Sequence, residues 1–369
     1  MDKASDRELA ARFGLTVLGF NGWTSSADRQ SRVANIRSLN PSIKLAQYVW
    51  ASEMYDVVAL KDPLYPAWKA VNDNNWWARN AAGARVQWST QFSDFVVNLT
   101  AWAPKDANGQ SWAQVRAKWD TDTLLKSTPG IDYIFIDNFM PRPLLDADWK
   151  RIGTNQSRTD PEIQSAWRTG YLNYVAALRT LNPTLKVMGN TSEAPSSAEY
   201  KGQLEGAMRE CMMGKSWSLE TWKGWAAMMA DYRLSLTSTK APRDVIFHAC
   251  GDTLNSSWMR YGLASALLED GWFGFTVTGQ SAPPWFDEYS AKIGTAAELP
   301  PTAATPSGIW TRKYSNGIVL VNPTAVTSSI DIGPGYKRIS GTQDPATNNG
   351  LPAQMVTLLP KQGLILVKQ

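Results

Sequence analysis

Short runs rich in β-branched and aromatic residues alternate along the chain with longer amphipathic segments, and this alternation constrains the fold most strongly. We expect strands at 15–23, 44–50, 94–102, 131–139, 185–192, 204–211, 243–252 and 271–279. The segments between them, expected to be mainly helical, are 26–41, 63–83, 111–130, 160–183, 219–240, 256–270 and 283–294. Strands that alternate with helices pair in parallel. The sequence therefore predicts an α/β fold, and eight such units favour a (β/α)8 barrel of the TIM type over an open sheet.

The pattern changes after residue 296. Segment 298–308, ELPPTAATPSG, is rich in Pro, Thr and Ala, which is typical of a linker. Segments 309–324 and 355–369 each contain two strand-like runs separated by a turn. We therefore expect a barrel over 1–297, a linker over 298–308 and a small antiparallel β domain over 309–369.

Charge and cysteine content exclude several classes of protein. The net charge is +4 from scattered charges, so we expect neither a nucleic-acid partner nor a membrane surface. Two cysteines and one histidine argue against a cysteine-based zinc site and a multi-histidine metal centre, and we expect no metal and no cofactor. We expect Cys211 and Cys250 to be free, buried thiols, because their strand positions place them on opposite faces.

The chain has no apolar run of about 18 residues and does not begin with a signal-peptide pattern. An extracellular or periplasmic location is expected if a signal peptide has been removed. The sequence does not define the oligomeric state.

The catalytic groups of such barrels lie at the carboxyl ends of the strands. The side chains expected there are carboxylates, amides and tryptophans, without a Ser-His-Asp order, a nucleophile elbow or a phosphate loop. Cleavage of a glycosidic bond needs only two carboxylates, one as nucleophile or base and one as general acid. The sequence therefore predicts a glycoside hydrolase.

Asp137 is the candidate nucleophile, because the run YIFIDNF (133–139) delivers it at the end of a buried strand. A buried carboxylate is costly unless it is paired, and a stiff strand fixes its position as a nucleophile requires. Glu210, at the end of a comparable run, is the candidate general acid/base, and Glu193 and Asp252 are alternative acids. The structural alternatives are a carboxylate that caps a loop for Asp137 and an ion pair for Glu210.

Amides grip sugar hydroxyls, and tryptophans stack on sugar rings. The candidate substrate-binding residues are Asn21, Trp23, Trp50, Glu53, Asn98, Trp102, Asn138, Asn190, His248, Asp252, Gln280 and Trp285. A lone barrel histidine such as His248 is more often a hydrogen-bonded interior residue than a catalyst. Among the 18 tryptophans, those at helical spacing are expected to pack in the interior: Trp76, Trp77, Trp222 and Trp225.

Four stretches together carry a family resemblance: YIFIDNF (133–139), GNTSEAP (189–195), LEGAMREC (204–211) and the C-terminal pair NGIVLVNPT and VTLLPKQGLILV. This ordered set resembles the hypothetical glycosyl hydrolase family 15, within the α-galactosidase-like superfamily of TIM barrels. The resemblance implies a barrel followed by a C-terminal β-sandwich, and retaining hydrolysis with Asp137 on the fourth strand. Related groups take their acid from the fifth strand, where Glu193 is the candidate.

The leading hypothesis is a retaining hydrolase that acts on a polysaccharide or oligosaccharide. A transglycosylase would use the same residues, and product analysis separates the two. A non-catalytic carbohydrate-binding barrel would bind glycans without cleaving them. A lyase or isomerase with a carboxylate-bound metal would lose its activity in a chelator.

Overall fold

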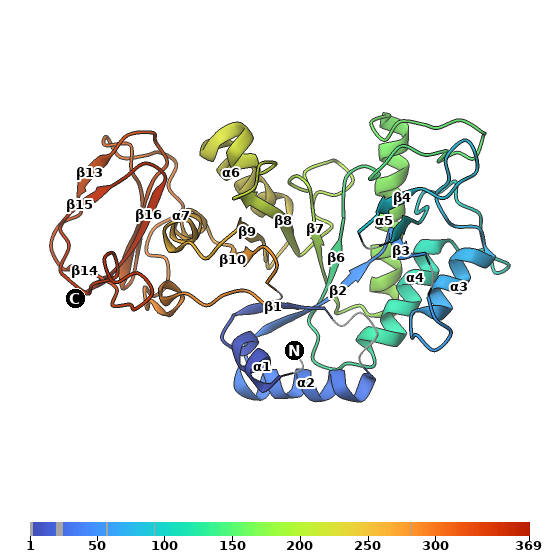
Figure 1. Cartoon of the computed structure of the whole chain (residues 1–369), viewed down its shortest axis with the longest axis horizontal. Helices are drawn as coiled ribbons and strands as arrows, with labels where there is room; N and C mark the ends of the chain where they lie inside the picture. The colour runs from blue at the N-terminus through green and yellow to red at the C-terminus, as the bar shows by residue number, and fades with distance from the viewer. Residues whose placement is uncertain (1–2, 20–24, 57, 92, 281) are drawn as a thin grey trace. The chain divides into compact units, whose positions relative to one another are not determined.

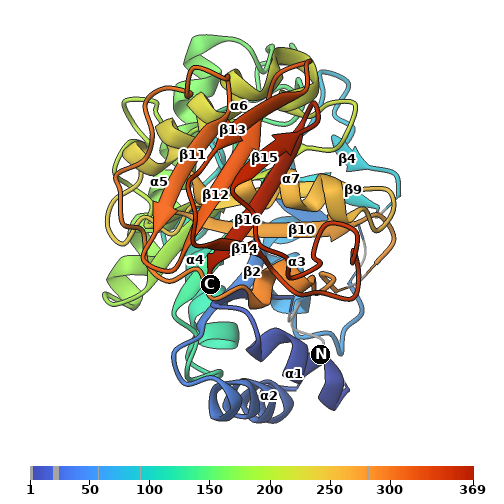
Figure 2. The same cartoon turned by 90° about the vertical axis from the view of Figure 1, so that its left-hand side faces the viewer.

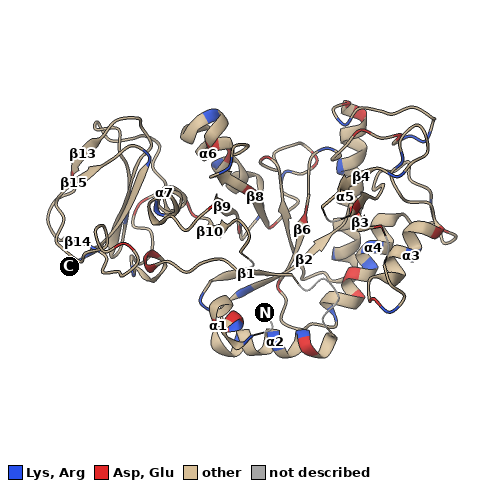
Figure 3. Cartoon of the chain, viewed as in Figure 1, with Lys and Arg blue, Asp and Glu red and all other residues tan. Residues whose placement is uncertain are grey.

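The computed structural model describes residues 3–19, 25–56, 58–91, 93–280 and 282–369 (Figure 1). The chain forms two compact units. The first comprises Met1–Ala207 with Ser238–Pro242, and the second comprises Met208–Thr237 with Arg243–Gln369. Figure 3 shows acidic and basic residues interspersed within each unit. No helix among the described residues is both long and apolar enough to span a bilayer.

Four parallel strands of the barrel sheet lie in the first unit, in the order β1 (Leu15–Leu18), β2 (Lys44–Trp50), β6 (Tyr133–Asp137) and β7 (Lys186–Asn190). The helices of this unit are α1 (Ala4–Ala11), α2 (Ser26–Leu39), α3 (Tyr65–Asp73), α4 (Trp112–Trp119) and α5 (Pro161–Leu181), and α4 continues into the π-helical turn η1 (Asp120–Leu125). Asp160 caps α5 by accepting the amides of Glu162 and Ile163, so the predicted start of this helix is confirmed.

The expected third barrel strand, 94–102, is wrong. Strand β5 (Asp94–Val96) pairs antiparallel with β3 (Glu53–Tyr55) and β4 (Gln87–Ser89) in a separate three-stranded sheet. The strand ends early because the Asn98 side chain accepts both the amide and the hydroxyl of Thr100, which turns the chain. An apolar run predicts a strand, but it does not reveal the strand's partner.

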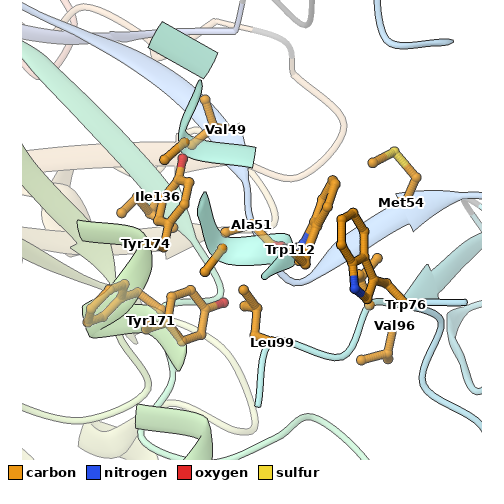
Figure 4. Close-up of a cluster of buried hydrophobic side chains, with 14 of the residues drawn as sticks. Val49, Ala51, Met54, Trp76, Val96, Leu99, Trp112, Ile136, Tyr171 and Tyr174 are labelled. Carbon is orange, nitrogen blue, oxygen red and sulfur yellow. Dashed lines mark hydrogen bonds between the residues drawn. The ribbon is translucent and has the colours of Figure 1, made fainter. Parts of the chain in front are cut away.

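A large cluster of buried aromatic and aliphatic side chains forms the core of the first unit, and Figure 4 shows part of it. It includes Trp76 and Trp77, which are buried as expected. Helix α5 approaches this core closely at Gly170, where an added Cβ would lie 2.2 Å from the Leu99 carbonyl oxygen.

The second unit contains the parallel strands β9 (Ile246–Gly251) and β10 (Trp272–Val277) and most of β8 (Gly206–Met213). Its helices are α6 (Leu219–Ser238) and α7 (Ser256–Leu267), with a 3-10 turn η2 (Asp287–Ser290). Trp225 is buried as expected, but Trp222 is exposed, which corrects its expected packing role. Gly224, with φ 80°, interrupts α6 between them, so helical spacing does not carry across it.

The two cysteines form a disulfide, with their Cα atoms 5.1 Å apart, so the expectation of free thiols is wrong. The pairing of β8 with β9 shifts register between Arg209 and Met213, and Cys211 has φ 45°. A bulge of this kind breaks the strict alternation of side chains. It therefore allows Cys211 to reach Cys250 despite their unfavourable positions in the sequence pattern.

The C-terminal strands are antiparallel. Strands β11 (Trp310–Tyr314), β12 (Gly317–Asn322), β16 (Gln362–Lys368) and β14 (Tyr336–Arg338) form one sheet in that order, and β13 (Ser328–Asp331) pairs with β15 (Met355–Leu358) (Figure 2). The fold is thus a TIM-barrel type α/β fold followed by small antiparallel sheets, as the sequence predicts. The domain limits at 297 and 309 stay a prediction.

Candidate active site

Strand β6 carries Asp137 to its carboxyl end. The four preceding residues, Tyr133 to Ile136, are buried, whereas Asp137 is half-buried. In the parallel register, Trp50 of β2 lies opposite Asp137. Because side chains alternate along a strand, Tyr48 shares the face of Trp50. Two apolar strands therefore place a tyrosine and a tryptophan next to this carboxylate.

The Asp137 carboxylate accepts hydrogen bonds from three donors. Its Oδ1 accepts the backbone N–H of Asn138 at 2.9 Å and Nδ2 of Asn190, at the end of β7, at 2.7 Å. Its Oδ2 accepts the Tyr48 hydroxyl, and Trp50 Nε1 donates to that hydroxyl at 2.5 Å. Burial and the neighbouring Asp137 charge raise the pKa of Tyr48, so its hydroxyl stays a donor. Donors from β2 and β7 thus hold the carboxylate in one orientation.

A second carboxyl group, Glu53, lies in the same network. Glu53 begins β3 and is 4% exposed. Its Oε2 accepts Asn138 Nδ2 at 2.9 Å, and its Oε1 lies 2.8 Å from Ser52 Oγ. Burial, followed by the charge of Asp137, raises the pKa of Glu53 to about 8. Glu53 and Asp137 thus belong to one hydrogen-bond network, but Glu53 is more deeply buried than Asp137. Pairs of carboxyl groups in different environments recur at catalytic sites.

The structure brings four predicted substrate-binding residues into this network around Asp137: Trp50, Glu53, Asn138 and Asn190. Asn98 has a different role: its side chain is buried and accepts the amide of Thr100, which stabilises the turn there. The ring of Trp102 lies under Lys150 Nζ, 5.3 Å away. The predicted residues Asn21 and Trp23 lie outside the described residues.

The candidate acids have different surroundings. Glu210 lies in β8 and is exposed. Glu193 is exposed in the segment after β7 and lines a pocket of ≈ 250 Å³ with Thr191. Asp252 follows β9 and pairs with Lys215, beside a pocket of ≈ 420 Å³ in the second unit.

His248 lies inside the second unit. It is 8% exposed, and its Nδ1 accepts the backbone N–H of Cys211 at 3.1 Å. Burial lowers the pKa of His248 to about 4, so its imidazole is neutral near pH 7. Of the remaining candidates, Gln280 is exposed after β10, and half-buried Trp285 packs edge-on against Tyr289.

A metal-type donor group does occur among the described residues. The donor atoms of Cys211, His248 and Cys250 lie within 4.8 Å of one another. The two sulfur atoms are bonded to each other, and the imidazole nitrogen already accepts an amide hydrogen. While the disulfide is intact, the two sulfur atoms and this imidazole nitrogen already have partners within the protein.

Three residues of the network did not emerge from the sequence as candidates: Tyr48, Ser52 and Tyr171. Tyr48 was detectable, because it lies two positions before Trp50 and so shares its strand face. Ser52 directly precedes Glu53. Tyr171, on α5, donates to the Asn138 carbonyl oxygen at 2.7 Å from 33 residues away, and no local pattern indicates this contact.

Solved structures that resemble this chain in fold include several glycoside hydrolases. An Anoxybacillus α-amylase superposes with a TM-score of 0.53 at 9% identity, covering 99% of this chain and 89% of that one. The glycoside hydrolase domain of PelA from Pseudomonas aeruginosa superposes with a TM-score of 0.46 at 14% identity, covering 75% and 92%. The α-galactosidase AgaA from Geobacillus stearothermophilus gives 0.49 at 9% identity and 99% coverage, although this chain spans only 53% of its length.

The chain thus combines a TIM-type barrel with a carboxylate that is hydrogen-bonded at the carboxyl end of one of its strands. The sequence profile of the hypothetical glycosyl hydrolase family 15 matches residues 37–318, and the chain belongs to this family. The expected resemblance is therefore confirmed. The comparison with curated proteins found no match.

Proposed function

We propose that the protein is a retaining glycoside hydrolase that cleaves a glycosidic bond in a polysaccharide or oligosaccharide. The observation that carries this proposal is the Asp137 carboxylate, oriented by Tyr48, Asn138 and Asn190 at the end of a barrel strand. Such anchoring suits a nucleophile, because attack on a sugar carbon requires a defined approach. Family membership supports the carbohydrate substrate.

In the proposed reaction, an Asp137 oxygen attacks the anomeric carbon while a general acid protonates the departing glycosidic oxygen. This step gives a covalent glycosyl ester on Asp137. The acid, now a base, then removes a proton from water, which hydrolyses the ester with overall retention.

We assign the role of general acid/base to Glu210, with Glu193 and Asp252 as alternatives. Glutamine or asparagine variants of each position separate them. Loss of the true acid/base slows both steps. Azide is a small nucleophile that needs no base, so it should restore turnover of an activated aryl glycoside by such a variant. The product of this rescued reaction is a glycosyl azide. Rescue of Glu193→Gln or Asp252→Asn rather than Glu210→Gln would reassign the role.

The nucleophile is tested with a panel of polysaccharides and the Asp137→Asn variant. We expect the wild type to release sugars from at least one glycan and the variant to be slower by at least about 10³-fold, because asparagine is a poor nucleophile. Asp73→Asn is the matched control, since Asp73 is exposed on α3 in a surface pair with Lys69. Equal cleavage by Asp137→Asn and the control would contradict the assignment.

The retaining mechanism has a separate test in the first product formed. We expect proton NMR of early time points to show the anomer of the substrate, before mutarotation mixes the two forms. The opposite anomer would instead indicate a single displacement by water.

A further inference from the structure

We propose that Glu53 carries its carboxyl proton at neutral pH and acts as a positioning residue for Asp137. The inference rests on the proposed function in assigning a catalytic role to Asp137. The protonation of Glu53 does not depend on that role and is argued from contacts within the first unit.

The first argument is a count of hydrogens. Three oxygen–oxygen contacts form a chain: Glu53 Oε1 to Ser52 Oγ at 2.8 Å, Ser52 Oγ to Tyr171 OH at 2.9 Å, and Tyr171 OH to the Asn138 carbonyl oxygen at 2.7 Å. Each contact needs one hydrogen, but the two hydroxyl groups supply only two. The missing hydrogen is the carboxyl proton of Glu53.

With that proton in place, every donor finds an acceptor. The Glu53 carboxyl donates to Ser52, Ser52 donates to Tyr171, and Tyr171 donates to the carbonyl of Asn138. Ser52 and Tyr171 are fully buried, and Figure 4 shows Tyr171 among the hydrophobic side chains of the core. If Glu53 were ionised, one close pair of buried oxygens would lack a hydrogen, which is costly in such surroundings.

The charges around Glu53 act in the same direction. Among the described residues, the charged neighbours with the largest effect on Glu53 are the acids Asp137 on β6 and Asp94 on β5, and both raise its pKa. The hydroxyls of Tyr48 on β2 and Tyr171 on α5 also face it and are neutral, because burial raises their pKa values. Burial raises the pKa of Glu53 to about 8, and it outweighs the hydrogen bonds that Ser52 and Asn138 can donate to the ionised carboxylate, which lower the pKa.

The consequence for Asp137 passes through Asn138. This residue has φ 50°, an uncommon conformation for a residue other than glycine. Its carbonyl accepts from Tyr171, its side chain donates to Glu53, and its amide donates to Asp137. A neutral Glu53 completes the contacts that hold Asn138, whereas an ionised one would place a second negative charge beside the nucleophile.

The test is carbon-13 NMR of the full chain with labelled glutamate carboxyls, titrated from pH 5 to 9.5. We expect one glutamate resonance with a midpoint near pH 8 that is missing in Glu53→Gln. The backbone amide of Asn138 should shift with the same midpoint. If Glu53→Gln removes only a resonance that titrates below pH 6, Glu53 is ionised at neutral pH and the proposal fails. An Asn138 amide that ignores the titration would overturn the positioning role.

A second variant keeps the test decisive if Glu53→Gln does not fold. Tyr171→Phe removes one hydroxyl and two of the three contacts, so the remaining Ser52 hydrogen satisfies an ionised Glu53. We expect the midpoint assigned to Glu53 to fall by at least one pH unit. An unchanged midpoint would contradict the hydrogen count.

The pH dependence of kcat provides a further test, because a purely structural role of Glu53 would leave this dependence unchanged. Glutamine has an N–H in place of the carboxyl O–H and does not titrate, so Glu53→Gln should lose the decline of kcat above pH 8 that we expect in the wild type. An identical decline in both proteins would overturn the coupling to Asp137. Because the NMR midpoint needs no substrate, its result remains valid even if Asp137→Asn shows that the proposed function is wrong.

Discussion

At the scale of single residues, the orientation of Asp137 depends on donors that the structure assigns to other strands. The Tyr48 hydroxyl donates to Asp137 while its ring stacks on Phe135, with centroids 6.0 Å apart. Tyr48→Phe therefore removes the donor and keeps the packing. A hydrogen bond to a charged group contributes about 1.5–3 kcal/mol, so we expect kcat to fall about 10- to 100-fold.

The control for this prediction is Tyr336→Phe, on β14 of the second unit, which should leave kcat unchanged. Kinetics on the glycan cleaved by the wild type provide the measurement. If Tyr48→Phe keeps full kcat, the hydroxyl does not orient the proposed nucleophile, Asp137.

His248 gives a prediction about stability and pH. Its folded-state pKa is about 4, against an ordinary value of 6.5, so the unfolded chain binds this proton more tightly. Stability should therefore fall as the pH drops from about 6.5 to 4, by about 3 kcal/mol from this group. Urea unfolding at several pH values measures this slope, and His248→Asn should flatten it. Equal slopes for both proteins would show that the buried imidazole does not cause the loss of stability at low pH.

At the scale of elements, the contact of α7 with β16 requires a residue without a side chain. A Cβ added at Gly363 would lie 2.6 Å from the Arg260 carbonyl oxygen and 2.7 Å from Ala264 Cβ. Gly363→Ala must push the strand from the helix, and overpacking of this kind costs about 1–3 kcal/mol. Gly274→Ala, on β10, is the control, because its nearest neighbour would be 3.6 Å away. Chemical denaturation should show a loss for the first variant alone.

At the scale of the whole molecule, the disulfide between Cys211 and Cys250 links positions 39 residues apart. Such a link restricts the unfolded chain and contributes about 2–4 kcal/mol. We expect reduction, or the double variant Cys211→Ser with Cys250→Ser, to lower the melting temperature. Thiol titration of the denatured, unreduced protein should detect no free thiol, and two reactive thiols would contradict the bond.

The sequence by itself determined the features that depend on neighbours along the chain. Strand β2 has the predicted limits, and α5 begins at Pro161, next to the predicted start of the helical segment at 160. Asp137 was identifiable because an apolar run of strand length leads directly to it. Periodicity, capping and burial preference act over a few residues, so the linear pattern carries them.

Only the tertiary structure decided which segments meet. Strand β5 pairs with β3 and β4 rather than with the barrel strands, and a register shift in β8 lets Cys211 reach Cys250. The pairing of Glu53 with Asn138, 85 positions apart, likewise depends on the folded backbone. A strand's pattern specifies that it pairs but not with which partner. A carboxyl group's pKa depends on the burial and charges that distant segments bring to it.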